Sequence, residues 1–470
     1  MRRFLATLRV PALAAALLFA GSAALAQTAP APDAAVTALQ DAYVLKVAPG
    51  AQADQYRELF ATVLQRVQRS YASEVDLPAL AAEAKKVVER RAAGGADPAA
   101  VFSEAMNAAL QTLDPYSRYL DPRARGNERD SFGPGFGGLG LQVEAGDGAV
   151  RVVEPIPGSP ADRAGLRAGD LIVRVDEHPL TGLPLSDAIA RMRGEPGTVV
   201  AITVRRTGEE FTVSLTRDTI RRQAVRWSME GEVLVLRVST FSGAVTAALR
   251  QAVTEASATR TPQAVVLDLR GNPGGLLTEA VRMADAFLGQ GEIVSLRGRT
   301  ASNQRSWQAD AAELLPGVPM VVMVDRRSAS ASELVAAALQ DNGRAFVMGQ
   351  RSFGKGSVQT TFGLGEEARG ALKLTTAFYH GPSGRSVHHA GITPDVELTG
   401  APKTEARGEA WGQDASAPGE APAAPASQAR VDQGRCAAVY KAADPALSCA
   451  VAYLQARTLD AFLGAVAGRR

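Results

Sequence analysis

Three serines stand at alternate positions where a strongly apolar segment gives way to a helix-like one. Residues 318–324 are apolar throughout and read as a buried strand. Ser328, Ser330 and Ser332 follow, and Glu333 comes next. Ser330 and Glu333 have the S-x-x-E spacing of a capping box, in which a hydroxyl and a carboxylate satisfy the first backbone N–H groups of a helix. The alternative is a nucleophile, because a strand-to-helix turn exposes a hydroxyl beside a helix N-terminus that favours developing negative charge.

A serine hydroxyl becomes a good nucleophile only when a neighbouring base removes its proton. Histidine is the usual base. However, the histidines of this chain stand in turn or loop contexts where solvated side chains are common, namely His178, His380, His388 and His389. Lys355 is the alternative, because burial can lower the pKa of a lysine from about 10.4 towards neutrality. Gly354 and Gly356 on either side allow close packing around its amine. Gly356 also occupies the position where a phosphate-binding loop needs Ser or Thr, which excludes that motif.

A glycine-rich run, residues 271–275, precedes the serines. Its sequence, Gly-Asn-Pro-Gly-Gly, is superficially like the nucleophile loop of chymotrypsin-like proteases, but Pro273 stands where that loop has its serine. Proline has no hydroxyl, so this run cannot supply the nucleophile. It can supply backbone N–H groups, or it can simply form a turn whose glycines need positive φ.

Composition excludes several classes of protein. The chain has 470 residues, of which 46% are hydrophobic and 21% charged, so neither wholesale disorder nor a polytopic membrane protein fits. The formal charge of +2 provides no broad field for a nucleic acid, which we exclude as a partner. With two Cys and four His, a zinc or iron–sulfur site has few ligands to draw on, and we expect no metal and no cofactor.

Hydrophobic periodicity predicts a multidomain α/β protein. Phe60, Val63, Val67 and Tyr71 recur at helical spacing, whereas strand-like and helix-like runs alternate over 233–398. The residues after about 400 are mainly Ala, Pro, Gly, Glu and Ser, which cannot bury enough apolar surface to fold. The expected order is a signal peptide (1–26), a linker (27–42), a helical N-terminal region (43–128), a β-rich module (129–218), an α/β layered core (219–400), a disordered linker (401–433) and a short helical C-terminal segment (434–470).

The first residues predict export. Three arginines precede an apolar run, residues 13–20, and small residues lead to Ala26, after which cleavage is expected. An uncleaved membrane anchor is the alternative, but the run is shorter than the ~20 apolar residues that span a bilayer. In an oxidising compartment, Cys436 and Cys449 are expected to form a disulfide rather than a reactive pair.

The spacing of three residues resembles a known family. Lys355 follows Ser330 by 25 positions, and Gln359 follows Lys355 by four. This pattern is similar to the active-site pattern of the carboxyl-terminal processing peptidases, also called tail-specific proteases. The resemblance covers about residues 40–400. Three further stretches reinforce it: Asp268-Leu-Arg-Gly-Asn-Pro-Gly-Gly275, Gly391-Ile-Thr-Pro-Asp395 and Leu113-Asp-Pro-Tyr-Ser-Arg-Tyr-Leu120.

The resemblance implies a role for each matching residue. Ser330 would be the nucleophile, Lys355 the general base and Gln359 the residue that orients the lysine. The backbone N–H of Ala331, together with that of Gly274 or Gly275, would form an oxyanion hole. One departure is Arg327, where the family often has a small residue before the serines.

The β-rich module looks like a PDZ domain ahead of an α/β protease core. Residues 137–143 open a strand with glycines that could cradle a chain-terminal carboxylate, and the strand edge could accept an extended peptide. A purely structural glycine turn is the alternative. Arg193 looks like the arginine that couples tail binding to active-site assembly in related proteases. The expected peptide-binding residues are Gly138, Leu139, Gly140 and Leu141.

These features predict an exported serine endopeptidase that recognises free, apolar C-termini of unfolded or precursor proteins. It would act in the periplasm, or at the membrane if the signal remains uncleaved. A substrate-delivering accessory lipoprotein and a homo-oligomer are further expectations, neither of which the residues decide. The first alternative is a Ser-His-Asp PDZ protease, but in that type the catalytic core precedes the PDZ module. The second is a non-catalytic PDZ adaptor, against which the Ser/Lys/Gln set argues.

Overall fold

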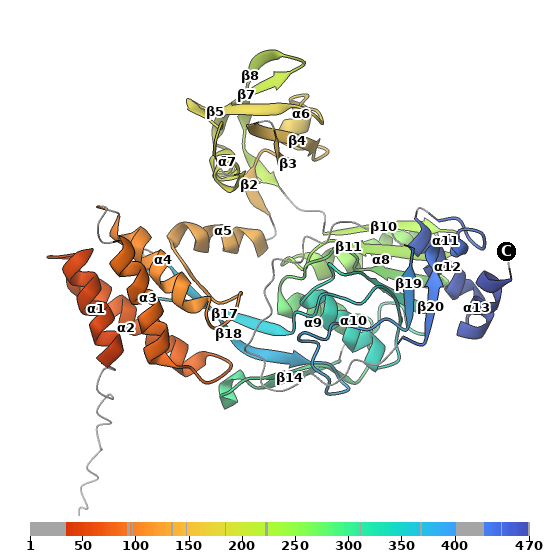
Figure 1. Cartoon of the computed structure of the whole chain (residues 1–470). Helices are drawn as coiled ribbons and strands as arrows, with labels where there is room; N and C mark the ends of the chain where they lie inside the picture. The colour runs from red at the N-terminus through yellow and green to blue at the C-terminus, as the bar shows by residue number, and fades with distance from the viewer. Residues whose placement is uncertain are drawn as a thin grey trace, which may run out of the picture.

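Three parts of the chain are distinct in the computed structural model (Figure 1). A helical region and an α/β core form an elongated body, and a small β module stands apart from it. The structure describes residues 34–91, 95, 97–132, 135–146, 148–183, 185–220, 224–310, 312–366, 369–400, 427–442 and 444–468. The expected signal peptide lies outside these residues. Within them, no helix combines the length and the apolar character needed to cross a membrane.

The N-terminal region is a helical bundle, as its periodicity predicted. Phe60, Val63 and Val67 lie on one face of the second helix and are buried. The expected linker 27–42 is wrong from residue 34 onward, because the first helix already starts there and buries Val36 and Leu39 against the bundle. The helices are α1 (Ala34–Lys46), α2 (Ala53–Ser70), α3 (Leu77–Arg91) and α4 (Pro98–Leu110).

The β module is a small antiparallel sheet with strand order β3-β4-β5-β7-β8. A helix, α5 (Pro122–Phe132), runs from the helical region towards it (Figure 1). The expected boundary between residues 128 and 129 therefore falls inside one continuous helix. The module contains β2 (Phe136–Gly138), β3 (Leu141–Gly146), β4 (Ala149–Pro155), α6 (Pro160–Arg163), β5 (Leu171–Val175), β6 (His178–Pro179), α7 (Leu185–Met192), β7 (Val199–Arg206), β8 (Glu209–Thr216) and β9 (Asp218–Ile220).

The α/β core contains a mainly parallel sheet with order β10-β11-β12-β15-β16-β19-β20. Its central strands β12 and β15 are buried along their whole length, as expected for strands covered on both faces. The predicted alternation of strands and helices is confirmed. The elements are β10 (Val225–Glu230), β11 (Val233–Val238), α8 (Val245–Thr259), β12 (Ala264–Asp268), α9 (Leu277–Asp285), β15 (Met320–Val324), α10 (Ala331–Asp341), β16 (Phe346–Gly349), β19 (Val396–Thr399) and β20 (Ala429–Asp432).

A second sheet joins the helical region to the core. Its long strand, β18, pairs with β17 along most of its length and also with β1 and β13. Leu372 and Leu374 of β18 pack within the helical core, while Tyr379 near its end packs within the α/β core. The hairpin formed by β17 and β18 therefore spans both parts (Figure 1). The elements are β1 (Arg118–Leu120), β13 (Glu292–Arg297), a 3₁₀ turn (Ala301–Asn303), β14 (Arg305–Gln308), β17 (Ser357–Gly363) and β18 (Ala371–His380).

The C-terminal segment packs on the parallel sheet. It contains α11 (Gln433–Cys436), α12 (Pro445–Ala456) and α13 (Leu459–Ala467), and a disulfide joins Cys436 to Cys449. The expected disordered linker 401–433 is wrong at its end, because β20 pairs in parallel with β19 and thereby satisfies its backbone groups. Residues 401–426 lie outside the described residues.

Removing the disulfide is expected to destabilise this segment. It closes a loop between positions 13 residues apart, and the chain-entropy model assigns ~3 kcal/mol to a loop of about this length. A Cys436→Ser/Cys449→Ser variant should lose this amount of stability in the C-terminal helices. Hydrogen exchange of these helices, measured as urea is increased, reports the loss. Reductant should destabilise the wild type equally and leave the variant unaffected. Equal stability of wild type and variant would contradict the prediction.

Candidate active site

Ser330 occupies a strained position at the turn between β15 and α10. It is the N-cap of α10, with φ +55° and ψ −113°. Positive φ is uncommon for a residue with a side chain, and such backbone strain costs of order 1–3 kcal/mol. Strain of this kind persists where surrounding contacts enforce it, and it clusters at functional sites. The geometry therefore singles out Ser330 rather than the turn as a whole.

The two neighbouring serines have structural roles. Ser328 and Ser332 are fully buried. Ser328 Oγ donates to the carbonyl oxygen of Leu269 (2.9 Å), and Ser332 Oγ donates to that of Asn272 (2.9 Å). Both hydroxyls thus fasten the serine turn to the loop after β12. Of the three, Ser330 is the one that lines a cleft.

The cleft has a volume of about 780 Å³ and lies between the core and α5. Ser330 and Lys355 both line it, so the structure brings the predicted nucleophile and base to one site. Gln359 and the three predicted oxyanion residues line it as well. The remaining lining residues are Arg125, Glu128, Arg129, Thr240, Pro273, Leu276, Leu277, Leu334, Ser357, Val358, Thr361, Lys373 and Tyr379.

The Lys355 amine is largely buried, and its pKa is lowered to about 8. Burial is the main cause, because it penalises the ammonium form. The positive charges of Lys373 and Arg118 lower the pKa further. The amine nitrogen lies 4.2 Å from the centre of the Tyr116 ring. Tyr116 belongs to the 113–120 stretch, so the helical region directly contacts the candidate base.

Glu333 ties the serine turn to the lysine loop. Its buried carboxylate accepts from the N–H groups of Ser330 (2.7 Å) and Lys355 (2.8 Å). It also accepts from Gly354 N–H (2.6 Å) and Ser352 Oγ (2.6 Å). Burial raises the pKa of Glu333, and these four hydrogen bonds oppose that shift. Sequence analysis predicted only a capping role for Glu333, whereas this residue also holds the loop that carries the candidate base.

Tyr379 is a second link, and sequence reasoning missed it. Its hydroxyl donates to the carbonyl oxygens of Ser330 (2.9 Å) and Lys355 (2.7 Å). Burial raises the pKa of this phenol well above its usual value, which keeps it protonated as a donor. Tyr379 belongs to β18 and is far from the serines in sequence, so no local motif predicts this contact.

Gln359 lines the same cleft as the lysine, and its amide nitrogen is bonded to two hydroxyls. Nε2 donates to Ser357 Oγ (3.0 Å) and Thr375 Oγ1 (3.1 Å). An amide nitrogen carries two hydrogens, so both are engaged with hydroxyls in this structure. Ser117 Oγ in turn accepts from Thr375 N–H (3.0 Å) and donates to Asp114 Oδ2 (2.7 Å). The 113–120 stretch thus supports the strand against which Gln359 rests.

The loop 271–275 packs directly against the nucleophile turn. A Cβ on Gly274, whose φ is +99°, would lie 2.9 Å from Ser330 Cβ and 3.0 Å from Ala331 N. A Cβ on Gly275 would lie 2.3 Å from Phe241 O. Gly274 N–H donates to Asn272 Oδ1 (2.9 Å). Both glycines are therefore required by close backbone approach, and the N–H of Gly274 already has an acceptor.

The expectation that the histidines are solvated is wrong for His388, which is 4% exposed. Its ring lies 4.8 Å from that of Phe378 and 4.0 Å from that of His389. Gly356 N–H donates to its Nδ1 (3.3 Å). His388 thus packs behind the lysine loop, because the segment after β18 folds back over it. It is not among the residues that line the cleft.

Arg327, the departure from the family pattern, points outward. Its side chain is 66% exposed, and its guanidinium lies 3.7 Å from the Asp325 carboxylate. The backbone N–H of Arg327 donates to the same carboxylate (2.9 Å). A large side chain at this position is therefore accommodated without entering the serine turn.

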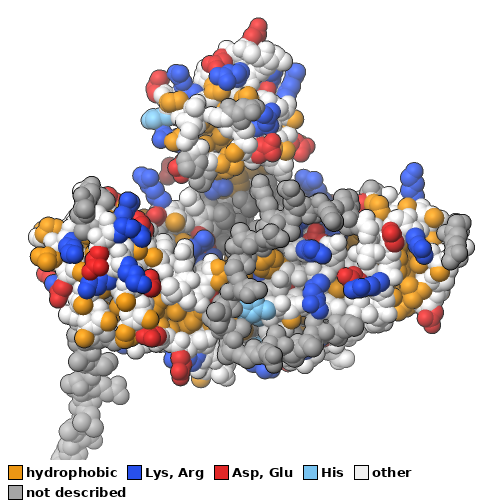
Figure 2. Space-filling view, in the orientation of Figure 1, with side chains coloured by type: hydrophobic (Ala, Val, Ile, Leu, Met, Phe, Trp, Pro, Cys, Tyr) orange, Lys and Arg blue, Asp and Glu red, His pale blue; other side chains and the backbone are white. Residues whose placement is uncertain are grey.

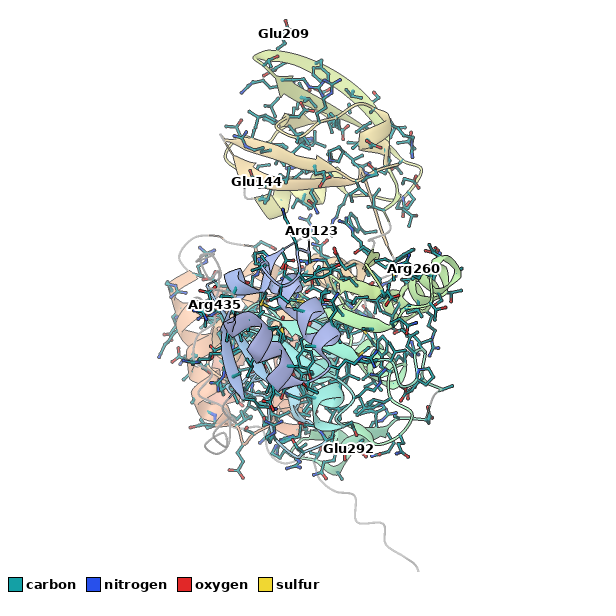
Figure 3. All side chains as sticks on the ribbon, turned by 90° about the vertical axis from the view of Figure 1, so that its right-hand side faces the viewer. Arg123, Glu144, Glu209, Arg260, Glu292 and Arg435 are labelled. Atoms are coloured by element: carbon teal, nitrogen blue, oxygen red, sulfur yellow. A yellow bond between two sulfur atoms is a disulfide. The ribbon has the colours of Figure 1, made fainter. Side chains whose placement is uncertain are left out.

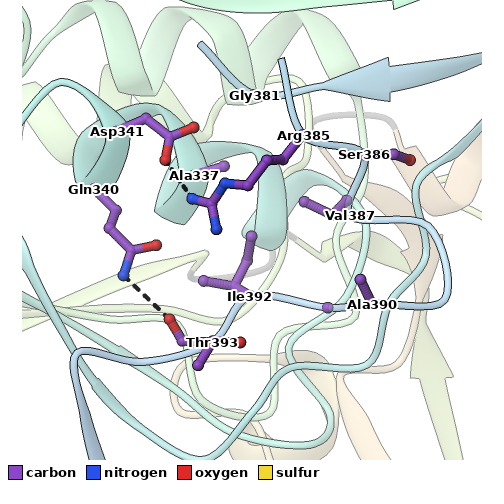
Figure 4. A pocket seen from close by; sticks show the side chains of 11 residues that line it. Ala337, Gln340, Asp341, Gly381, Arg385, Ser386, Val387, Ala390, Ile392 and Thr393 are labelled. Atoms are coloured by element: carbon purple, nitrogen blue, oxygen red, sulfur yellow. Dashed lines mark hydrogen bonds and ion pairs between the residues drawn. The ribbon is translucent and has the colours of Figure 1, made fainter. Parts of the chain in front are cut away.

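A much smaller pocket of about 20 Å³ lies at the other end of α10 (Figure 4). An ion pair between Arg385 and Asp341 (2.6 Å) runs across it, and Gln340 Nε2 donates to Thr393 O (3.1 Å). Thr393 belongs to the 391–395 stretch. The neighbouring Ile392 N–H donates to Ser352 Oγ (2.6 Å). This region supports the lysine loop from behind and offers no room for a substrate.

The residues predicted to bind a peptide lie in β2, at the start of β3 and in the segment between these strands. Leu139 is buried and its carbonyl oxygen accepts from Ala161 N–H (3.0 Å). Gly140 has φ +76° and its carbonyl oxygen accepts from Ser159 Oγ (3.1 Å). Gly138 ends β2, and Leu141 begins β3, the edge strand of the sheet. The arrangement leaves one edge of β3 for an added strand.

Arg193 follows directly after α7 in the same module. Its guanidinium is 4.5 Å from the centre of the Phe136 ring on β2. Residue 193 follows α7, and Gly194 N–H donates to Gly137 O (3.3 Å). The predicted regulatory arginine therefore stacks on the strand through which the module joins α5.

Two family models and several known proteins match this chain. The family model "Peptidase family S41" matches residues 232–398, and a PDZ-domain model matches residues 151–206. A carboxy-terminal-processing protease of Bartonella bacilliformis is 42% identical over 305 residues, covering 64% of this chain and 70% of that protein. A probable CtpA-like serine protease of Staphylococcus aureus is 35% identical over 286 residues, or 61% of this chain and 57% of that protein.

Among solved structures, a photosystem II D1 C-terminal processing protease is 31% identical. The match covers 72% of this chain and 92% of that one, with a TM-score of 0.45. The two family models and the identity to the Bartonella protein define the class: a serine-type peptidase with a PDZ domain. The chain belongs to the carboxy-terminal-processing proteases of peptidase family S41.

Proposed function

We propose that this chain is an exported endopeptidase that captures the free, apolar C-termini of unfolded or precursor polypeptides and cuts them with a Ser330–Lys355 dyad. One observation carries the proposal: a largely buried lysine with a lowered pKa lines the same cleft as a serine held at positive φ. The expected cleavage of the signal after Ala26 and a periplasmic location belong to this proposal. So do an accessory lipoprotein and a homo-oligomer.

The dyad would act through an acyl-enzyme. Neutral Lys355 takes the proton of Ser330 as Oγ attacks the scissile carbonyl, and the resulting ammonium then gives a proton to the leaving amine. A water molecule, deprotonated by the same amine, then hydrolyses the ester. Glu333 and Tyr379 keep the backbones of both residues in place, so the approach of the two side chains is preorganised.

The negative oxygen of the tetrahedral intermediate needs backbone donors. Ala331 N–H stands at the start of α10, where the helix dipole also favours negative charge. Gly274 N–H is engaged by Asn272, which favours Gly275 as the partner donor in this conformation. Such a donor is typically worth ~2.7–4 kcal/mol in the transition state.

The contacts of His388 weigh against a Ser-His-Asp mechanism. Its Nδ1 accepts a backbone N–H from the lysine loop, and the ring packs between aromatic neighbours outside the cleft lining. Membership of a peptidase family weighs against a non-catalytic adaptor.

The proposed function is tested with an unfolded reporter protein that ends in an apolar tail. The purified enzyme should cut the reporter, and blocking its C-terminal carboxylate or fusing a folded domain after the tail should slow cleavage. Ser330→Ala should bind the tail with wild-type affinity and release no product. Binding without hydrolysis by the wild type across diverse unfolded reporters would instead establish an adaptor.

A further inference from the structure

One wall of the cleft comes from outside the α/β core. The helix α5 contributes Arg125, Glu128 and Arg129, which lie on one face because they are three and four positions apart. The core contributes the apolar side chains of Leu276 and Leu277 to the lining. A peptide in this cleft would therefore contact both apolar side chains of the core and a charged helix.

The charges on this helix face do not cancel. Glu128 forms an ion pair with Lys373 and lies 3.8 Å from Arg118, so its charge is already compensated. Arg125 donates to the carbonyl oxygen of Gly370 (3.3 Å). Among the described residues, neither Arg125 nor Arg129 forms an ion pair with a carboxylate. Two guanidinium groups thus face the cleft with their charges unneutralised.

This concentration of charge is local. Basic and acidic side chains are interspersed over the visible face of the molecule (Figure 2), and the whole chain carries a formal charge of +2. A cleft with low-dielectric walls focuses the field of the charges that line it. The field of Arg125 and Arg129 therefore acts mainly on what enters the cleft.

We propose that Arg125 and Arg129 form a carboxylate-binding subsite within the cleft, which selects peptides carrying a carboxylate beyond the scissile bond. The proposal rests on the proposed function, because it takes the cleft to be where the peptide is cut. The guanidinium fork matches a carboxylate geometrically and binds it with two parallel hydrogen bonds. The carboxylate is either an acidic side chain or the C-terminus of the substrate.

Three matched peptides with one cleavage sequence test the subsite. One carries a Glu beyond the scissile bond and a C-terminal amide, the second a Gln and a free C-terminus, and the third a Gln and an amide. Wild-type kcat/KM should be about tenfold higher for a carboxylate-bearing peptide than for the neutral one, mainly through KM. In Arg125→Gln/Arg129→Gln the ratio for the amidated Glu peptide should fall to about one, and the free C-terminus should keep only the preference that the PDZ domain gives it. High salt should lower the wild-type ratio.

Arg123→Gln is the matched control. Arg123 lies on the same helix, is exposed, and is not among the residues that line the cleft; it lies between the β module and the body (Figure 3). This variant should keep the wild-type ratio. If the double variant loses only the preference for the Glu peptide, the ligand is an acidic side chain; if it loses only the preference for the free C-terminus, the ligand is the chain end. A double variant with the wild-type ratio, or a wild type without any preference, overturns the proposal.

Binding separates this proposal from the proposed function. The same peptides are titrated into Ser330→Ala with and without the two arginine substitutions, so that no hydrolysis is needed. The amidated Glu peptide has no terminal carboxylate for the PDZ domain, and its affinity should still fall about tenfold on loss of the arginines. Failure of the wild type to cut any peptide would refute the proposed function, while this binding difference would still decide the subsite.

Discussion

Replacing Lys355 by methionine is expected to lower kcat/KM by about 10⁴-fold, the upper end of the range for general-base catalysis. The reason is that the Ser330 hydroxyl would lose the group that accepts its proton. The fold should survive, because the substitution removes a polar amine from a largely buried position and keeps an unbranched chain of similar length against Tyr116. Hydrolysis of an unfolded reporter and circular dichroism measure the two effects.

Lys355→Arg is the control that separates a base from a positive charge. A guanidinium stays protonated at any accessible pH and therefore cannot accept the serine proton. The arginine variant should be as inactive as the methionine variant. Substantial activity in Lys355→Arg would show that position 355 acts through its charge, and the dyad would have to be abandoned.

Gly274→Ala is expected to lower kcat by about 10²–10³-fold, the loss seen when one oxyanion donor is removed. An added Cβ would approach the Ala329 carbonyl oxygen to 2.7 Å and Ala331 N to 3.0 Å. These are backbone atoms, so relief requires the nucleophile turn or the glycine loop to move. The displacement would affect the region where the Ala331 N–H is proposed to meet the oxyanion.

Gly271→Ala is the matched control for backbone strain. Gly271 has φ +72°, so alanine is strained there as well, but its Cβ would meet only the flexible Arg327 side chain, at 3.3 Å. Both variants carry the strain of positive φ, but only Gly274→Ala also displaces the nucleophile turn, so only Gly274→Ala should lose kcat strongly. Equal kcat values for Gly274→Ala and Gly271→Ala would contradict the proposed placement of the oxyanion hole.

Local patterns predicted the regular strands and helices of the fold well. The alternating strand-like and helix-like runs expected over 233–398 include β11 and α10, because apolar runs and periodicity are local properties. Short elements that tertiary pairing stabilises were missed. The four residues of β20 contain one buried apolar side chain, Val431, and they form a strand because β19 offers an unpaired edge.

The candidate site was predicted less completely than the fold. Family resemblance supplied Ser330, Lys355 and Gln359, but no pattern in the sequence revealed the Tyr379 bridge or the contact between Tyr116 and the lysine. Both contacts depend on the β17–β18 hairpin, which brings the helical region and the core together. A long-range contact of this kind produces no hydrophobic periodicity in a single sequence, so pattern analysis cannot predict it. The same holds for α5, whose arginines acquire a role only through their position in the cleft.

The most direct test of the central claim follows the rate at which a serine-directed fluorophosphonate phosphonylates Ser330, with loss of fluoride, from about pH 6 to about pH 10. A lysine base is active when neutral, so its active fraction increases as pH rises through its pKa. With the pKa of Lys355 lowered to about 8, the rate should rise through that value and stay high in alkali. A rate that already levels off near the usual histidine value of about 6.5 would contradict the account.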